Sequence, residues 1–498
     1  MDFNYDVIIV GGGVAGSLCA WKLSQQKNLK ILIIDEGANE LDENQRKEFV
    51  STFAVATNKS QLSPYTKLES NKYAVNQDGG GDKFNLNRYY VQPGPDLFKS
   101  AGVRIVGGST WAWRGNTPRF LPNDLKLKTT YNVAEDWPIS YDDIEPYYAE
   151  AERELGVSGN DEEWDNILPG AYRSVKFPMP NIVQSYGSLQ VKDKIEGLEI
   201  DGKTIKVVST PQARNSQAYD GRSACQGNSS CIPICPSGAK YDASVHLNKA
   251  KANGVELKTS CVVTKLEAGA NGNVNQVFFK DWSTTAIKEQ FLTAKIVVLA
   301  THGIETPKLW LSSPTLGNKS DQVGRNLMDH LAEEVTGLFP DPVFPFRGPQ
   351  STSSIEVFRD GDFRKFCGAF RMTIGNDGWG RREPPIKSLE NLLLEDLGVD
   401  DSGKKKTGIL FGKELQSRLE ERVTRLLRIG YSTEMLPNKD NRVTLSDEKD
   451  AFDLVRPKIT VKIDDYSKKA LAYGYSVAKR IFDRIEGNRE VEPIAPTL

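Results

Sequence analysis

The chain is poor in histidine and cysteine, and it has no long apolar run. Its three histidines, His246, His302 and His330, leave few candidates for acid–base chemistry near neutral pH. Six cysteines in 498 residues, three of them scattered singly, do not suggest a disulfide framework. No stretch approaches the roughly 20 apolar residues that a membrane-spanning helix needs, so we do not expect the chain to cross a membrane alone.

The sequence shows neither an excess of charge nor the pattern of a secretion signal. The formal net charge of −2 argues against nucleic-acid binding, which selects a strongly basic face. The first residues, MDFNYDVIIV, enter an apolar run almost at once and leave no room for a signal peptide. If the protein functions outside the cytoplasm, something other than an N-terminal signal peptide must direct its export. The length favours two closely packed globular domains.

A glycine-rich turn, GGGVAG, stands near the N-terminus between the apolar runs DVIIV and KILII. This order predicts a strand–turn–helix–strand unit that binds a dinucleotide. Gly11 permits the tight turn, Gly13 lets the backbone approach a pyrophosphate, and Gly16 allows close helix–strand packing. Asp35 ends the second run, where its carboxylate can bind ribose hydroxyls. The alternative is a glycine-rich turn that holds no ligand.

Three cysteines, Cys225, Cys231 and Cys235, are grouped in the run ACQGNSSCIPICPSGAKYD. Their C-x5-C-x3-C spacing, followed by proline, is typical of iron–sulfur ligation, because soft thiolates prefer clustered iron or zinc. Zinc with His246 as fourth ligand is the competing interpretation, although structural zinc sites use shorter C-x2–4-C spacings. Together with a dinucleotide site, an iron–sulfur centre favours a dehydrogenase that passes electrons singly to an external acceptor.

A second glycine pair, Gly107 and Gly108, follows a predicted strand in the run VRIVGGSTWAWRGNTPRF. Trp111 and Trp113 alternate behind it, so they either form the wall of a flat ring or belong to the core.

Two helices are predicted from the pattern of caps and apolar residues. In DWPISYDDIEPYYAEAEREL, Ser140 caps a helix with Asp143 three residues on. Its expected buried face carries Ile144, Tyr147, Ala151 and Leu155. A last helix is expected over 465–486, with Leu471, Gly474, Val477, Ile481 and Ile485 on one face.

These motifs, together with ATHGIETPKLWL, VGRNLMDH and EMLPNKDNRVTL, resemble the glucose–methanol–choline (GMC) oxidoreductase superfamily. More narrowly, they resemble the catalytic subunits of bacterial FAD-dependent sugar and polyol dehydrogenases. The resemblance implies an α/β fold: a Rossmann-like FAD-binding domain and a substrate domain of mixed or antiparallel sheet plus helices. The expected FAD-binding domain comprises residues 1–120 and 200–335, with the cysteine segment at 225–235. The expected substrate domain comprises residues 121–199 and 336–498.

The resemblance also assigns roles to individual residues. Gly11, Gly13, Gly16 and Asp35 would hold the FAD pyrophosphate and ribose. Gly107, Gly108 and Thr110 would lie against the flavin, and Val263 would contact adenine through its backbone. Cys225, Cys231 and Cys235 would ligate a 3Fe–4S cluster. Ala112 stands where relatives often have the histidine of a WHW motif, so FAD is expected to bind without a covalent link.

The activity that the resemblance implies is oxidation of a CH–OH group of a sugar or polyol. Hydride would pass to flavin N5, and electrons would leave through the cluster to a cytochrome c or quinone-linked acceptor. The implied partners are a small chaperone or export subunit and a cytochrome c subunit. The expected location is periplasmic, with membrane association only through partners, and a cytoplasmic location is the open alternative.

The chain departs from the superfamily's pattern at the catalytic base. The superfamily places its catalytic histidine, with a His or Asn partner, in a C-terminal GHxxGT-like segment, which is expected beyond Leu498. None of the chain's three histidines stands in that context. A second hypothesis is therefore a truncated or split flavoprotein that binds both cofactors but is inactive unaided. A third is an FAD hydroxylase, which shares the first glycine motif but needs no cysteine cluster.

Overall fold

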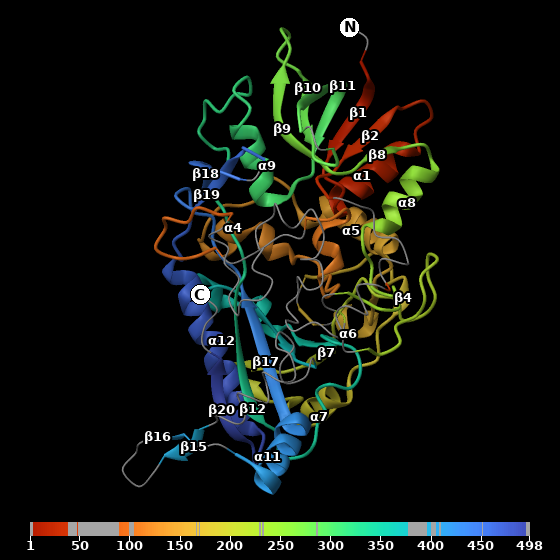
Figure 1. Cartoon of the computed structure of the whole chain (residues 1–498). Coiled ribbons are helices and arrows are strands. Elements are labelled where there is room, and N and C mark those ends of the chain that lie inside the picture. The colour runs from red at the N-terminus through yellow and green to blue at the C-terminus, as the bar shows by residue number, and fades with distance from the viewer. Residues whose placement is uncertain are drawn as a thin grey trace.

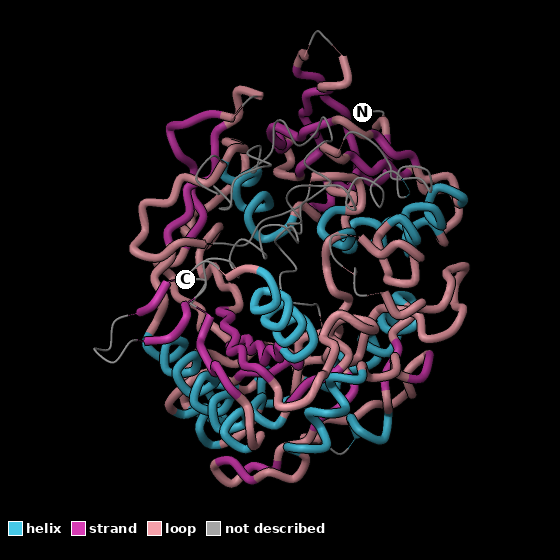
Figure 2. Tube along the Cα trace, turned by 60° about the horizontal axis from the view of Figure 1, so that its bottom comes forward, coloured by secondary structure: helices cyan, strands magenta, loops and turns pink. Residues whose placement is uncertain are grey.

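Two six-stranded sheets organise the chain, one at each end of the view in Figure 1. The computed structural model describes residues 3–37, 47, 89–98, 104–165, 167–168, 170–228, 231, 234–284, 287–376, 396–399, 405–407, 410–450 and 452–494. The helices and strands of both parts can be followed along the trace in Figure 2.

The first sheet contains the predicted nucleotide-binding unit. Its strands, in spatial order, are β8 (Glu256–Lys258), β2 (Ile31–Ile34), β1 (Tyr5–Val10), β11 (Glu289–Leu299), β10 (Val274–Asp281) and β9 (Cys261–Ala268). The first four are parallel, whereas β10 and β9 pair antiparallel. The apolar runs of β1 and β2 are buried because both faces of this part of the sheet are covered.

Helices cover the two faces of the parallel strands. On one face, α1 (Val14–Ser24) and α8 (Ser244–Ala252) pack against Val7 and Ile9. On the other face, Ile8 and Val10 pack toward β9, β10 and α9 (His302–Leu311). This alternation follows from the two-residue period of a strand.

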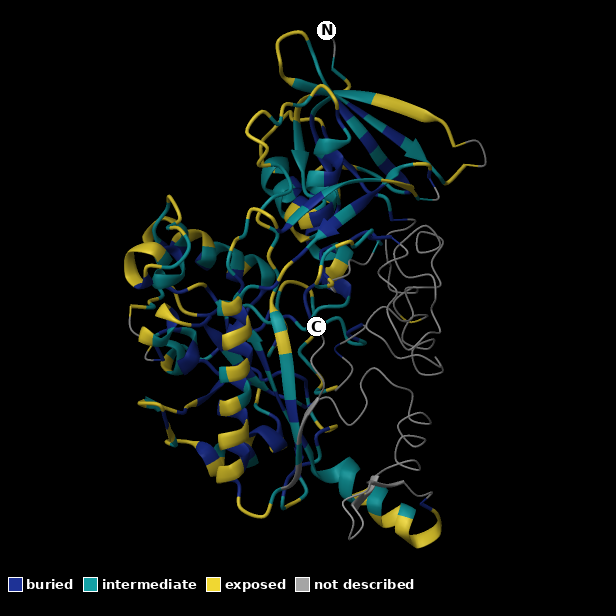
Figure 3. Cartoon of the chain, turned by 90° about the vertical axis from the view of Figure 1, so that its left-hand side faces the viewer, coloured by how far each residue is buried: buried dark blue, intermediate teal, exposed yellow. Residues whose placement is uncertain are grey.

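The second sheet is antiparallel. Its strands, in spatial order, are β20 (Arg489–Ile494), β12 (Leu331–Leu338), β17 (Leu426–Thr433), β14 (Phe370–Ile374), β13 (Ser353–Ile355) and β7 (Val207–Ser209). Its largest core cluster joins these strands to α12 (Asp465–Arg484) and α7 (Tyr186–Ile195). The outer face of α12 is exposed, as Figure 3 shows.

Shorter elements lie between and beside the two sheets. The remaining α-helices of the described residues are α4 (Leu127–Tyr131), α5 (Tyr141–Leu155), α6 (Asp161–Asp165) and α11 (Gly412–Arg425). The remaining strands pair as β3 (Ser158–Gly159) with β4 (Met179–Pro180), β5 (Glu199–Ile200) with β6 (Lys203–Thr204), β15 (Asp396–Val399) with β16 (Lys405–Thr407), and β18 (Arg442–Lys449) with β19 (Val455–Thr460). Among the described residues, no helix has the length and apolar character to span a bilayer.

The expected α/β fold, with a Rossmann-like part and a second, antiparallel part, is confirmed. The second sheet draws β7 from the range 200–335, and the domain boundaries themselves stay a prediction. The last predicted helix is present as α12, and it buries Leu471, Gly474, Val477 and Ile481 as expected.

The face predicted for α5 is wrong. The Ser140–Asp143 capping box is present, but Tyr147 is 70% exposed and the buried residues are Tyr141, Glu145, Ala149 and Glu152. The helix therefore turns a partly charged face inward.

Candidate functional site

A cavity of about 790 Å³ opens at the carboxyl ends of β1, β2 and β11. Ligands of open α/β sheets bind at this edge, and the volume lies within the usual range of small-molecule sites. Of the residues predicted to hold a cofactor, six line it: Gly11, Gly13, Asp35, Gly108, Thr110 and Val263. Gly16 and Gly107 do not line it; they pack beside its walls.

The glycine turn between β1 and α1 leaves room for a ligand at one position only. A side chain on Gly11, where φ is +101°, would come within 2.5 Å of the Ala300 carbonyl oxygen. One on Gly16 would come within 1.9 Å of the Gly11 carbonyl oxygen. At Gly13 no atom lies within 4 Å of the corresponding point, although Gly13 borders the cavity. The first helical turn of α1 thus faces open space, as a phosphate site requires.

Asp35 lies just after β2, and its carboxylate is buried at the cavity wall. The backbone N–H of Gly12 donates to Oδ2 at 2.7 Å, and that of Gly37 donates to Oδ1 at 2.7 Å. Burial raises the pKa of Asp35 above its usual range, and the two N–H donors act in the opposite direction. The side chain is held in place by these bonds and retains acceptor capacity for ribose hydroxyls.

The loop from Gly107 to Trp113 fixes one wall of the cavity. Gly107 has a φ of +95°, and a side chain there would come within 2.5 Å of the Trp111 indole nitrogen. Thr110 Oγ1 donates to the Gly107 carbonyl at 2.6 Å and accepts from the Ala243 N–H at 3.0 Å, which ties the loop to the start of α8. Trp111 and Trp113 do not line the cavity, and their indole N–H groups donate to carbonyls. Trp111 is therefore a core residue, and Trp113 is partly buried against the core.

A buried charged network at the cavity wall escaped the sequence analysis. Arg104 donates to Glu36 at 2.9 Å and to Glu305 at 3.1 Å, and Lys308 pairs with Glu305 at 3.2 Å. Tyr89 donates to Glu305 at 2.5 Å and accepts from Lys308 at 2.6 Å. Burial alone would raise the pKa of Glu305, but the Lys308 and Arg104 charges hold it down at about 2. In the sequence, the sign of this network is the i, i+3 spacing of Glu305 and Lys308. Ion pairs on exposed helix surfaces have the same spacing, so the sequence does not reveal that this pair is buried.

The three histidines occupy unrelated environments. His246 is fully buried, with Nδ1 bonded to the Tyr241 hydroxyl at 2.8 Å and Nε2 to Glu154 at 3.0 Å. Both nitrogens are committed, so His246 does not fit the zinc interpretation. His330 is exposed at the start of β12. His302 lines the cavity at the first residue of α9 with a φ of +62°, and burial lowers its pKa.

The cysteine segment is linked to the Trp111 loop through Lys240, whose ammonium donates to the carbonyls of Trp111, Trp113 and Cys231. Cys231 and Cys235 are buried and Cys225 is partly buried, and none of the three forms a disulfide within the described residues. Within the described ranges, no group of three or more His, Cys, Asp or Glu side chains is placed so that it could hold a metal ion. The expected 3Fe–4S cluster therefore stays a prediction.

The surroundings of the thiols affect their ionisation in different directions. Burial raises the pKa of Cys225, and charges on Cys231 and Cys235 would act in the same direction. Burial also acts against ionisation of Cys235, but bonds from the Lys240 N–H and Ser237, with the Lys240 charge, lower its pKa. Two buried cations beside the segment, Arg214 and Lys240, have no carboxylate ion pair in the described part of the chain.

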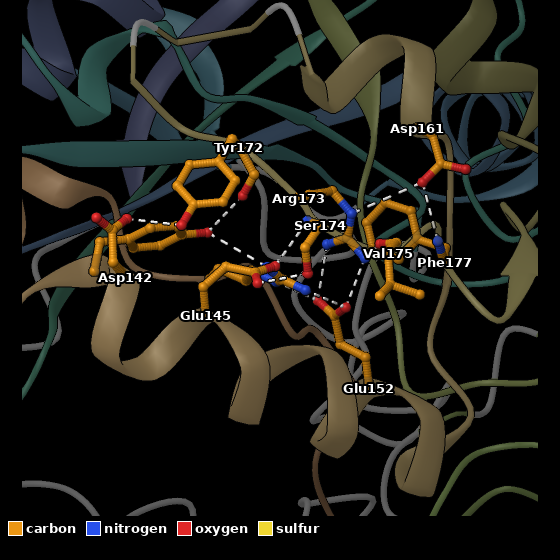
Figure 4. A network of polar contacts seen from close by, with 11 residues as sticks. Asp142, Glu145, Glu152, Asp161, Tyr172, Arg173, Ser174, Val175 and Phe177 are labelled. Carbon is orange, nitrogen blue, oxygen red and sulfur yellow. Dashed lines mark hydrogen bonds and ion pairs between the residues drawn. The ribbon is translucent and has the colours of Figure 1, made fainter.

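A second charged network lies around α5, away from the cavity (Figure 4). Arg119 and Arg173 each make two bonds of 2.6–2.9 Å to the carboxylate of Glu152, and Arg119 also donates to Glu145 at 2.7 Å. Ser174 donates to Glu145 through its N–H and its hydroxyl. This network fixes α5 to the chain on either side and is structural.

A glycine turn at the carboxyl ends of parallel strands, bordering a cavity of this size, is the arrangement of a dinucleotide-binding fold. The sequence profile of the GMC oxidoreductase family matches residues 5–332. The chain belongs to this family and is an FAD-dependent oxidoreductase that acts on CH–OH donors. The cavity fits FAD in its position, its volume and the open approach at Gly13.

Several curated relatives align over most of the chain. It is 34% identical to the fructose dehydrogenase large subunit of Gluconobacter japonicus, over 98% of this chain and 85% of that protein. It is 28% identical to the 6'''-hydroxyparomomycin C oxidase of Streptomyces lividus, over 80% and 68%. It is 26% identical to the paromamine 6'-oxidase of Streptomyces fradiae, over 96% and 76%.

Solved structures support the same fold. Pyridoxine 4-oxidase from Mesorbium loti aligns with a TM-score of 0.55 at 15% identity, over 99% of this chain and 84% of that one. Formate oxidase of Aspergillus oryzae RIB40 aligns with a TM-score of 0.54 at 14% identity, over 98% and 83%. At these identities the likeness concerns the fold alone.

Proposed function

We propose that this protein oxidises a CH–OH group of a sugar or polyol, with FAD bound non-covalently in the cavity. The observation that carries the proposal is the 34% identity to a fructose dehydrogenase large subunit, which extends over nearly the whole chain. The cavity at the strand ends supplies a place for the cofactor.

FAD, when bound, supplies flavin N5 as the acceptor of the hydride that leaves the substrate carbon, while the hydroxyl proton goes to a base. The chain's own residues bind and orient it. Gly13 admits the pyrophosphate to the start of α1, Asp35 accepts from the ribose, and the backbone at Val263 meets adenine. The fixed loop of Gly107, Gly108 and Thr110 lies against the flavin side.

The route of the electrons is the finer part of the proposal. Cys225, Cys231 and Cys235 would hold a 3Fe–4S cluster, and this cluster would supply one-electron transfer toward a cytochrome c or quinone-linked acceptor. A small chaperone or export subunit and a cytochrome c subunit are the proposed partners. The proposed location is the periplasm, at the membrane through those partners. The name of the Gluconobacter relative, a large subunit, supports a multi-subunit assembly.

Sugar oxidation is tested with purified protein under anaerobic conditions. We expect bound FAD to bleach on addition of one sugar or polyol from a panel that includes fructose, and dye reduction to follow. Failure of every sugar and polyol to bleach FAD would contradict the substrate class. Turnover by residues 1–498 alone would exclude the hypothesis of a chain that binds its cofactors but is inactive unaided.

The electron route needs a separate comparison. We expect Cys231→Ser to retain dye-linked turnover and to lose iron and cytochrome c reduction. Cys367→Ser is the matched control, because Cys367 is also a free, buried cysteine but lies outside the segment. Cytochrome c reduction at the wild-type rate in Cys231→Ser would contradict a route through the cluster.

A further inference from the structure

His302 lies at the carboxyl edge of the first sheet, just beyond the end of β11. β11 and β1 are adjacent and parallel, with Leu299 opposite Val10, and the Ala300 N–H donates to the Val10 carbonyl at 2.8 Å. Beyond these strands the chain turns to opposite faces of the sheet, since α1 packs on one face and α9 on the other. Ligands of open α/β sheets bind in the crevice that such a divergence leaves.

His302 and Gly13 leave these two strands at the same level. Gly13 stands two residues beyond Gly11, and His302 stands two residues beyond Ala300, whose carbonyl borders Gly11. Paired strands are about 4.8 Å apart. Both Gly13 and His302 line the cavity, and at Gly13 the space in front of the backbone is open. A phosphate that approaches Gly13 therefore comes within reach of a side chain at position 302.

The imidazole of His302 presents a hydrogen-bond donor. The Ile304 N–H donates to Nδ1 at 3.1 Å, so the neutral ring carries its proton on Nε2. No residue of the described ranges accepts from Nε2. The side chain is exposed, yet burial lowers the pKa of the imidazole, which fits a ring that borders a deep cavity and not the outer surface.

The backbone of His302 is in a conformation that glycine would adopt more easily. Its φ of +62° lies in the left-handed region, where residues other than glycine are strained and Asn, Asp and His are the commoner exceptions. Glycine is present at the next position, Gly303, but not at position 302. Strained residues concentrate at ligand sites, where the surroundings hold them in place. The strain thus agrees with a role for the imidazole itself in the cavity.

We propose that the Nε2–H of His302 donates a hydrogen bond to the pyrophosphate of FAD. His302 then binds the pyrophosphate from the side of β11, and the glycine turn binds it from the side of β1. This inference rests on the proposed place of FAD in the cavity, and it adds a residue that the glycine motif does not reveal. Hydrogen bonds to charged groups contribute more than bonds between neutral groups, so loss of this one should weaken FAD binding about ten- to a hundredfold.

The test compares three substitutions of His302 in the purified protein that carries FAD. Asn and Asp have nearly the same shape, and both tolerate the left-handed conformation. His302→Asn supplies an N–H donor, whereas His302→Asp places a carboxylate toward the phosphates. His302→Gly removes both the side chain and the strain. His330→Asn is the control, because His330 is exposed and does not line the cavity.

The measurements are FAD per chain, the dissociation constant of FAD from a fluorescence titration, and the phosphorus NMR spectrum of the bound pyrophosphate. We expect FAD binding to weaken about ten- to a hundredfold in His302→Gly and further in His302→Asp. His302→Asn should bind FAD more tightly than either. The phosphorus resonances should shift in His302→Gly and stay at their wild-type positions in His330→Asn. Circular dichroism checks the fold of each variant.

Wild-type affinity together with unchanged phosphorus resonances in His302→Gly would overturn the inference. Equal affinities of His302→Asn and His302→Asp would also overturn it, because the donor would then make no difference. This second comparison decides the matter if His302→Gly does not fold. A wild-type protein that binds no FAD would contradict the proposed function as well. FAD that is bound but not bleached by any sugar or polyol would contradict the proposed substrate class alone.

Discussion

The role of a glycine in the nucleotide turn depends on where its missing side chain would point. Gly16 is required by packing, because a side chain there would collide with the Gly11 carbonyl. Gly13 has ordinary backbone angles, φ −72° and ψ −169°, and open space in front of it. Packing does not require glycine at position 13. We infer that glycine is needed there because a side chain would block the approach of the ligand.

We therefore expect Gly13→Val to fold normally and to lose FAD. The new side chain fits the backbone but occupies the space of the pyrophosphate, which should weaken FAD binding at least tenfold, or by about 1.4 kcal/mol. FAD per chain and a fluorescence titration with FAD measure the effect, and circular dichroism checks the fold. Gly16→Ala, the matched substitution, should instead lower the yield of folded protein. Wild-type affinity for FAD in Gly13→Val would refute this account of the turn.

Residues of the candidate site could be predicted where uncommon residue types are grouped in the sequence. Three glycines in one turn, and three grouped cysteines, indicate special backbone or ligand chemistry directly. Arg104 and Lys308 could not be found in this way, because a charged residue in the sequence carries no sign of its burial. The burial of Arg214 and Lys240 was missed for the same reason.

At the scale of elements, α12 and α5 show when an apolar helical pattern predicts the buried face of a helix correctly. In α12 the apolar residues recur with the helical period and contact the second sheet, so the apolar stripe is the buried one. In α5 the buried residues recur just as regularly, but two of them are Glu145 and Glu152. Two arginines from outside the helix neutralise them, which no pattern within the helix reveals.

Removal of one of these glutamates should destabilise the protein strongly. Glu152→Ala removes the carboxylate that Arg119 and Arg173 share and leaves only the pairs of Arg119 with Glu145 and of Arg173 with Asp161. We expect a loss of about 3 kcal/mol in the free energy of unfolding. Glu150→Ala, on the same helix, removes a half-exposed pair with Lys22 and should change it by less than about 1 kcal/mol. Urea unfolding measures the free energy of unfolding of both variants. Equal effects of the two substitutions would mean that the network adds nothing to stability.

At the scale of the whole molecule, the sequence predicted two parts but not their assembly. The βαβ order of the first sheet is local, so its strands and turn could be derived from adjacent motifs. The second sheet joins β7 to strands more than 140 residues further along, as in the pairing of Ser353 with Ser209. Such long-range pairings leave no periodic signal in either segment, and only the family resemblance indicated that sheet.

The network of Glu36, Tyr89, Arg104, Glu305 and Lys308 joins distant segments of the chain, so it should appear in the acid stability of the whole protein. Because the pKa of Glu305 is held at about 2, below its usual 4.5, its contribution is present above pH 4.5 and is lost as the pH falls toward 2. We expect Glu305→Gln to lower the free energy of unfolding by about 3 kcal/mol at pH 7 and to flatten its decline between pH 4.5 and 2. Urea unfolding across this range, with Lys308→Met and the double variant, isolates the pair. If the free energy of unfolding of Glu305→Gln falls between pH 4.5 and 2 as steeply as that of the wild type, Glu305 does not link stability to pH.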